Sequence, residues 1–173
     1  MKKTILSVIA VFAIALSSNN LFAQTTTATP AGNLMATLSG NPDYDASAIA
    51  IRAAGLGATL KSAGPYTILA PRNTAFSKLA ADKLDSLFAD PVKLAAVFKG
   101  HVVSGIYDKA ALIKLLGSGT PTLTTLDGKT LTLSVTDKHL TFTDSEGNKA
   151  KVIAFDLLGT NGVAIGLDAV LTK

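Results

Sequence analysis

The chain is long enough for one globular domain, and its composition excludes disorder. It has 173 residues, of which 48% are hydrophobic and 16% charged, and it contains no cysteine. Such a chain folds without disulfides, and the lack of thiols excludes iron–sulfur clusters, thiolate zinc sites and cysteine nucleophiles. The net charge of +4 falls to +2 if Lys2 and Lys3 leave with an export signal, which is too little to indicate a nucleic-acid partner.

The first 23 residues have the regions of a signal peptide. Lys2 and Lys3 precede an apolar run of 12 residues at 5–16, and a polar stretch then leads to Ala23. The run fits the apolar region of a signal peptide and is shorter than the roughly 20 residues that span a bilayer. We therefore predict cleavage after Ala23, bacterial export to a periplasm or secretion, and no stable membrane insertion after signal removal. Residues 24–32 are Thr-rich and are expected to form a flexible tether.

Helices are predicted to dominate the first half of the remaining chain. Apolar residues at helical spacing, stopped by glycines, indicate short helices within 33–60. A buried strand is predicted at 66–70, stopped by Pro71. Asn73 is predicted to be the N-cap of the next helix, which turns Phe76 into the core. Asp90 and Pro91 repeat this pattern as N-cap and first residue of a helix that ends at Gly100.

Strands are predicted to dominate the second half. Asp108 caps one more helix, which ends at Gly117, and the apolar period then changes to two residues. Asp127-Gly128 is a strong hairpin signal, and residues 145–148 indicate another turn. Strands are predicted at 101–105, 130–136, 139–143, 152–155 and 162–171. Because helices gather early and strands late, the fold class is predicted to be α+β.

The sequence gives no strong catalytic or metal-binding motif. No serine lies in the G-x-S-x-G pattern of a hydrolase elbow, and neither glycine pair has the third glycine of a dinucleotide loop. His101 and His139 are 38 positions apart without a third nitrogen ligand. Residues 144–148 resemble the start of a calcium loop but lack its distal glutamate. We therefore predict no enzyme activity, no cofactor and no metal, with an unrecognised hydrolase site as a minor alternative.

Three blocks, taken together, resemble the fasciclin domain family. They are GPYTILAPRNTAF at 64–76, HVVSG at 101–105, and TNGV at 160–163 leading to DAVL at 168–171. The resemblance extends over roughly residues 33–172. It implies a single domain at 33–173 with a fasciclin-like fold, in which a layer of short helices packs on a twisted, mainly antiparallel β-wedge.

The resemblance also implies a function and a set of site residues. Family members are extracellular modules without catalysis, so we expect adhesion or matrix interaction with an extracellular protein, cell surface or polysaccharide. Positions implicated in receptor contact in animal members fall here on Asp156, Leu157 and His101. Gly100 and Ile165 depart from the animal pattern, and Asp156 has a structural alternative as a strand-end residue. The competing expectation is a carrier that holds a small apolar ligand or a glycan. We expect a monomer.

The motif residues are predicted to have structural roles. They are Thr67, Pro71, Asn73, Phe76, Asn161, Gly162 and Asp168. Thr67, Asn161 and Asp168, together with His101, are predicted to be buried hydrogen-bonding residues that join the helical layer to the sheet. Gly162 is predicted to allow a turn with positive φ before the closing strand.

Overall fold

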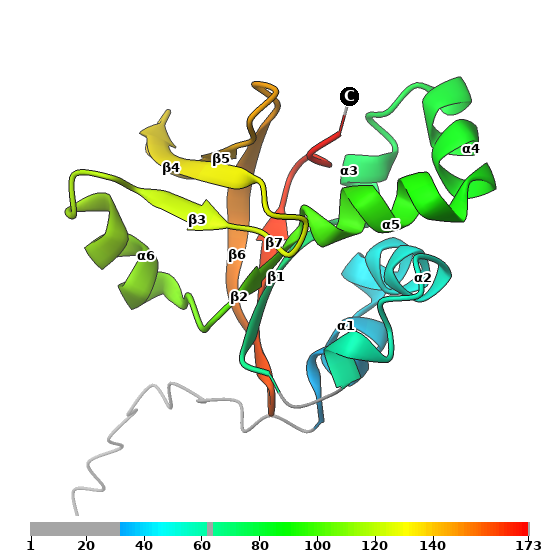
Figure 1. The fold of residues 1–173 in the computed structure, drawn as a ribbon, viewed down its shortest axis with the longest axis horizontal. Helices are drawn as coiled ribbons and strands as arrows, with labels where there is room; N and C mark the ends of the chain where they lie inside the picture. Colours follow the sequence, from blue (N-terminus) through cyan, green and yellow to red (C-terminus); the bar gives the residue numbers. More distant parts are fainter. Residues whose placement is uncertain (1–31, 62–63, 173) are drawn as a thin grey trace, which may run out of the picture.

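A strongly curved sheet lies at the centre of the molecule, with helices on both of its sides (Figure 1). The structure is a computed structural model and describes residues 32–61 and 64–172. The predicted signal peptide and most of the predicted tether lie outside these residues, so both remain predictions. Within the described part of the chain, no helix has the length and apolar character needed to cross a membrane.

The helices are short, and most of them come before the main run of strands. The α-helices are α1 (Leu34–Ser39), α2 (Asp45–Ala53), α3 (Asn73–Phe76), α4 (Ala81–Ala89), α5 (Pro91–Lys99) and α6 (Lys109–Leu116). Two 3₁₀-helices are η1 (Pro42–Tyr44) and η2 (Thr59–Lys61). Helices α1 to α5 lie on one side of the sheet and α6 lies on the other (Figure 1).

The strands in the described part of the chain form one seven-stranded sheet in the order β2-β1-β7-β6-β5-β4-β3. Their bounds are β1 (Tyr66–Pro71), β2 (Val102–Ser104), β3 (Thr122–Thr124), β4 (Thr130–Thr136), β5 (His139–Thr143), β6 (Lys149–Gly159) and β7 (Gly162–Leu167). Among the strands of the described residues, β1 and β7 pair in parallel and the other neighbours are antiparallel. The two edges approach each other where Val103 bridges to Thr125 and the Leu126 N–H donates to the Val102 carbonyl at 2.8 Å. The sheet is therefore nearly a closed barrel.

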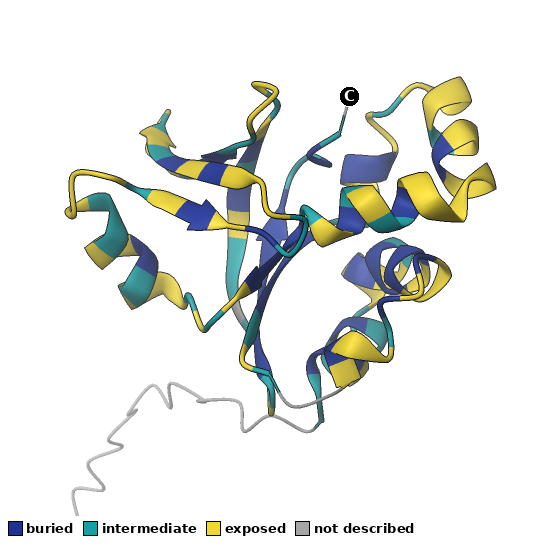
Figure 2. Ribbon diagram, in the orientation of Figure 1, coloured by how far each residue is buried: buried dark blue, intermediate teal, exposed yellow. Residues whose placement is uncertain are grey.

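The central strands are buried on both faces because each face covers a separate apolar core (Figure 2). Side chains alternate between the faces of a strand. Along β1, Ile68 and Ala70 belong to the core beneath the helices, whereas Leu69 belongs to the core inside the curved sheet. Leu112 of α6 packs into the inner core from the opposite side. The α+β class predicted from the sequence is confirmed.

Several local predictions are confirmed at the level of single residues. The Asp90 carboxylate accepts hydrogen bonds from the backbone N–H groups of Val92 and Lys93, at 2.9 and 3.1 Å, and α5 starts at Pro91. Asp108 accepts from the Ala111 N–H at 2.7 Å at the start of α6. The alternating strands 130–136 and 139–143 have the predicted bounds, as β4 and β5.

Other predictions were wrong or incomplete. Asn73 is not an N-cap: it lies inside α3, where its side chain accepts from the Ala46 N–H at 3.0 Å and donates to the Pro42 carbonyl at 2.7 Å. Asn73 therefore joins α3 to the η1–α2 corner, a long-range role that a local capping pattern does not reveal. Helix α4 and the short strand β3 were not predicted. β6 is longer than the predicted 152–155, and β7 ends at Leu167 rather than at residue 171; just after it, the Asp168 carboxylate accepts from the Lys151 N–H of β6.

Candidate functional site

A groove of about 420 Å³ runs along α5, and we call it the α5 groove. One side is formed by α5 and Gly100, and the other by the β3–β4 hairpin and the β5–β6 turn; residues 171–172 complete the lining. The groove has apolar side chains such as Val97, Leu131 and Leu171, together with several charged side chains. This combination suits a partner with both apolar and polar groups.

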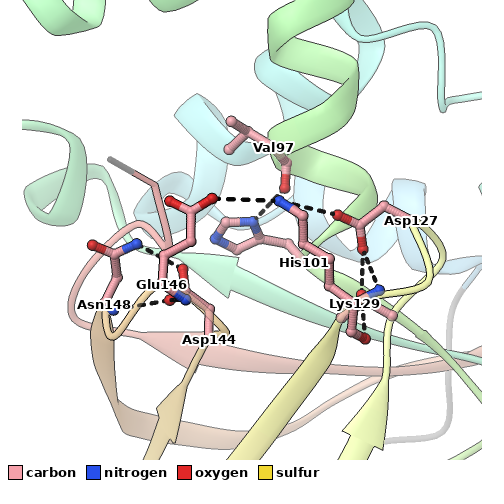
Figure 3. A network of polar contacts seen from close by, with 8 residues as sticks. Val97, His101, Asp127, Lys129, Asp144, Glu146 and Asn148 are labelled. Atoms are coloured by element: carbon pink, nitrogen blue, oxygen red, sulfur yellow. Dashed lines mark hydrogen bonds and ion pairs between the residues drawn. The ribbon is translucent and has the colours of Figure 1, made fainter.

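An ion network joins three residues that line the groove (Figure 3). The Lys129 ammonium lies 3.8 Å from an Asp127 carboxylate oxygen and 3.7 Å from a Glu146 carboxylate oxygen. Asp127 is also held by hydrogen bonds from the Thr125 hydroxyl and from the Lys129 N–H. The Asp127 side chain is only 14% exposed, whereas that of Lys129 is 55% exposed. Asp127 is thus fixed by the hairpin, while Lys129 is accessible to a partner.

The Asp144 carboxylate is used to build the β5–β6 turn. One of its oxygens accepts from the N–H groups of Glu146 and Asn148, both at 2.9 Å, and the other accepts from the Asn148 side-chain amide at 2.7 Å. In the sequence, residues 144–148 resemble the start of a calcium loop; in the structure, the Asp144 carboxylate is engaged by the hydrogen bonds of the turn. In the residues that the structure describes, no group of three or more histidine or acidic side chains is placed to hold a metal ion.

His101 lies beneath the groove and is completely buried. Its Nδ1 is 2.8 Å from the Val97 carbonyl oxygen, and the Leu171 N–H donates to its Nε2 at 3.1 Å. Because the carbonyl only accepts and the N–H only donates, the ring is neutral with its hydrogen on Nδ1. Burial lowers the pKa of His101, which keeps the ring neutral. The side chain has no surface of its own to offer a partner; it supports the groove from below.

The three predicted partner-binding residues belong to different parts of the fold. His101 lies between α5 and β2, whereas Asp156 and Leu157 belong to β6, and Leu157 does not line the α5 groove. The register of β6 against β7 is shifted between Ala154 and Leu157, so Asp156 lies in an irregular stretch of the strand. The Asp156 side chain lies outside the described residues. Leu157 is partly buried against the helix-side core.

Asn161 and Asp168 link segments that are far apart in the sequence. Asn161, in the turn between β6 and β7, accepts from the Leu34 N–H at 2.9 Å and donates to the Leu60 carbonyl at 2.6 Å, which ties α1 and η2 to the sheet. Asp168, just after β7, accepts from the Lys151 N–H at 2.7 Å and pairs with Lys78 at 3.4 Å. Unlike the prediction, Asn161 and Asp168 are both half-buried rather than buried.

Thr67 and Pro71 bond from β1 to two different neighbours. The buried Thr67 hydroxyl donates to the Gly105 carbonyl at 2.7 Å and accepts from the Tyr107 N–H at 2.9 Å, so it fixes the loop before α6 rather than the helical layer. The Pro71 carbonyl accepts from the buried Ser47 hydroxyl of α2 at 2.6 Å. These bonds hold both sides of β1 in place.

Phe76 and Gly162 are positioned by close packing. Phe76 is buried and stacks on Phe98 of α5, with 6.4 Å between ring centroids. Gly162 allows β7 to approach β1 so closely that a Cβ atom at this position would lie 1.9 Å from the Tyr66 carbonyl oxygen. Phe76 thus anchors the helix that forms one side of the groove.

Sequence reasoning did not single out Lys129 or Glu146 as site residues. Both lie in or beside turns, where charged residues are ordinary, and they meet only because two hairpins fold toward α5. The Asp127-Gly128 signal marked the first turn but gave no information about what the turn faces.

Known proteins resemble this chain in sequence and in fold. A family model for the fasciclin domain matches residues 42–173. The pig transforming growth factor-beta-induced protein ig-h3 is 33% identical over 122 residues, which are 70% of this chain and 16% of that protein. Protein sll1483 of Synechocystis sp. is 34% identical over 134 residues, 76% of this chain and 68% of that protein.

The same relationship holds among solved structures. The FAS1 domain pair from the insect cell adhesion molecule Fasciclin I aligns with a TM-score of 0.68 at 17% identity, covering 83% of this chain and 52% of that one. At this identity the alignment shows the fold alone. With the family match over most of its length, the chain belongs to the fasciclin domain family, whose members are associated with adhesion and extracellular proteins.

Proposed function

We propose that this protein is an exported, non-enzymatic adhesion or matrix-interaction module that binds a protein, cell-surface or polysaccharide partner at the α5 groove. Membership of the fasciclin family carries the proposal. Its fold is similar to part of a domain pair from an insect cell adhesion molecule, a likeness of fold that agrees with the proposal. Export rests on the predicted signal peptide and agrees with the extracellular association of the family.

The groove has the surface chemistry that recognition of a large partner needs. Its apolar residues provide area to bury, and the paired charges of Lys129, Asp127 and Glu146 provide directional polar contacts at its edge. Such charges favour specificity over raw affinity, because a partner of the wrong charge pattern must break the existing pairs. A charged edge suits a small apolar ligand less well, which favours adhesion over a carrier of such a ligand.

The test is a binding screen with the purified protein against immobilised matrix proteins, cells and extracellular polysaccharides at low and high salt. Ala96→Glu places a long charged side chain at an exposed α5 position that lines the groove. Ala110→Glu is the matched control on the exposed surface of α6, outside the groove. We expect saturable binding that Ala96→Glu abolishes and Ala110→Glu leaves intact.

Other outcomes separate the alternatives. Binding that both variants retain would mean that the partner docks elsewhere and would refute the groove as the site. A folded protein that binds none of these partners but carries a small molecule detectable by mass spectrometry would replace adhesion with the carrier function. Turnover of ester or glycoside substrates would contradict the non-enzymatic proposal.

A further inference from the structure

His101 joins two segments that come from different parts of the fold. Through Nδ1 it bonds Val97 in α5, and through Nε2 it accepts from Leu171 in the segment that follows β7. Val97 and Leu171 both line the α5 groove. We call residues 169–172 the C-terminal segment. The buried ring therefore holds the C-terminal segment against α5 directly beneath the groove.

We propose that His101 is a pH-dependent lock: it holds the C-terminal segment in place while the imidazole is neutral and releases it when the imidazole takes up a second proton. In the neutral ring, Nε2 is the acceptor that the Leu171 N–H needs. A proton on Nε2 makes it a donor, so two N–H groups then face each other across the 3.1 Å contact. The bond from Nδ1 to the Val97 carbonyl survives because a charged ring donates there more strongly. Protonation thus breaks the Leu171 bond alone.

The charged groups around His101 set the pH at which this happens. They are Lys93 of α5, Asp127 and Lys129 of the β3–β4 hairpin, and Asp144 and Glu146 of the β5–β6 turn. Asp144 and Asp127 favour the charged ring, but burial opposes it more strongly, so the pKa of His101 in the closed state is lowered. Asp168, just before the segment, stays paired with Lys78 and bonded to Lys151.

Acid therefore favours the open state, in which the C-terminal segment has left His101, over a defined pH range. Once the segment has left, the ring is hydrated and its pKa returns toward the ordinary value of about 6.5. Between that value and the lowered pKa of the closed state, each pH unit downward raises the opening constant by about tenfold, because only the open state binds the proton.

Opening would change the groove as well as the segment. Leu171 belongs to the core inside the curved sheet, and Val170 belongs to the core beneath the helices. Removal of the segment takes Leu171 and Thr172 out of the lining and uncovers apolar side chains of both cores. The groove becomes wider and more apolar in acid. The lock needs no partner, so its failure would leave the proposed function untouched.

The test is residue-resolved amide hydrogen exchange of the whole protein between pH 7 and pH 5, with the His101 ring followed by NMR over the same range. Protection factors are corrected for the intrinsic pH dependence of exchange. We expect the protection factor of the Leu171 amide to fall by up to about tenfold per pH unit as the ring titrates. The Ile165 amide in β7 reports on the intact sheet and is expected to keep its protection.

Two variants separate the lock from other acid effects. In His101→Gln, the amide carries a donor and an acceptor on one carbon, just as the two ring nitrogens of histidine are both bonded to Cε1. Glutamine does not titrate, so the Leu171 protection factor should become independent of pH. His139→Gln removes the other, exposed histidine and should behave as the wild type. An equal loss of Leu171 protection in wild type and His101→Gln would overturn the proposal.

The wild-type protein decides the matter if His101→Gln does not fold. Loss of Leu171 protection together with titration of His101, while Ile165 stays protected, supports the lock. Retention of Leu171 protection when the His101 ring is charged overturns it. Simultaneous loss of protection at Leu171 and Ile165 would also overturn it, because acid would then unfold the whole domain rather than release one segment.

Discussion

Asn161 offers the sharpest test of how the helical layer is attached to the sheet. Its side-chain amide bonds the Leu34 N–H and the Leu60 carbonyl, and both leucines are fully buried. Asn161→Ala removes both bonds and leaves the two backbone groups without these partners. An orphaned buried group costs about 1–3 kcal/mol, so we expect a loss of about 2–4 kcal/mol in the free energy of unfolding, with water at the half-buried turn reducing the sum.

The assay is equilibrium unfolding in urea, where a loss of this size lowers the midpoint by about 1–2 M. Asn148→Ala is the matched control: its side-chain amide donates to one Asp144 oxygen within a surface turn, so its loss should cost less than about 1 kcal/mol. If the free energy of unfolding of Asn161→Ala stays within about 0.5 kcal/mol of the wild type, the attachment does not depend on this amide and the reasoning fails.

Three further predictions concern the strand approach, the pH dependence of stability and export. Gly162→Ala should lower the free energy of unfolding by more than about 4 kcal/mol or prevent folding, because its Cβ would meet the Tyr66 carbonyl oxygen at 1.9 Å. The control Gly119→Ala has open space at its Cβ and should cost only about 1–2 kcal/mol of backbone strain. Equal melting temperatures of the two variants would contradict this prediction. The lowered pKa of His101 means that its contribution to stability is complete above about pH 6.5 and is lost as pH falls through the folded-state pKa. In urea unfolding, His101→Gln should lack the resulting slope of the free energy of unfolding against pH. An unchanged slope would assign the acid sensitivity to other groups. Expression with the native N-terminus in a bacterial host should give a protein that begins at Gln24 by mass spectrometry, whereas an intact N-terminus would contradict cleavage of the signal.

Local patterns were predictable where a residue acts on its own neighbours. Asp90 and Pro91 determine the start of α5 because the carboxylate reaches N–H groups only two and three positions away. The alternation in 130–136 predicted β4 because successive side chains of a strand point to opposite faces, so the period appears in consecutive residues. Asn73 shows the limit of this reasoning: asparagine is a residue type that often caps helices, yet the hydrogen-bond partners of this side chain lie about thirty positions upstream.

By itself, the sequence determined the α+β class, the family and most of the element positions, because these follow from composition, period and motifs carried by contiguous residues. Only the tertiary structure decided the parallel pairing of β1 with β7, the near closure of the sheet and the α5 groove. It also decided the roles of Asn73 and His101, whose partners come from distant segments. These features depend on long-range contacts, and no spacing along the chain encodes which hairpin will face which helix.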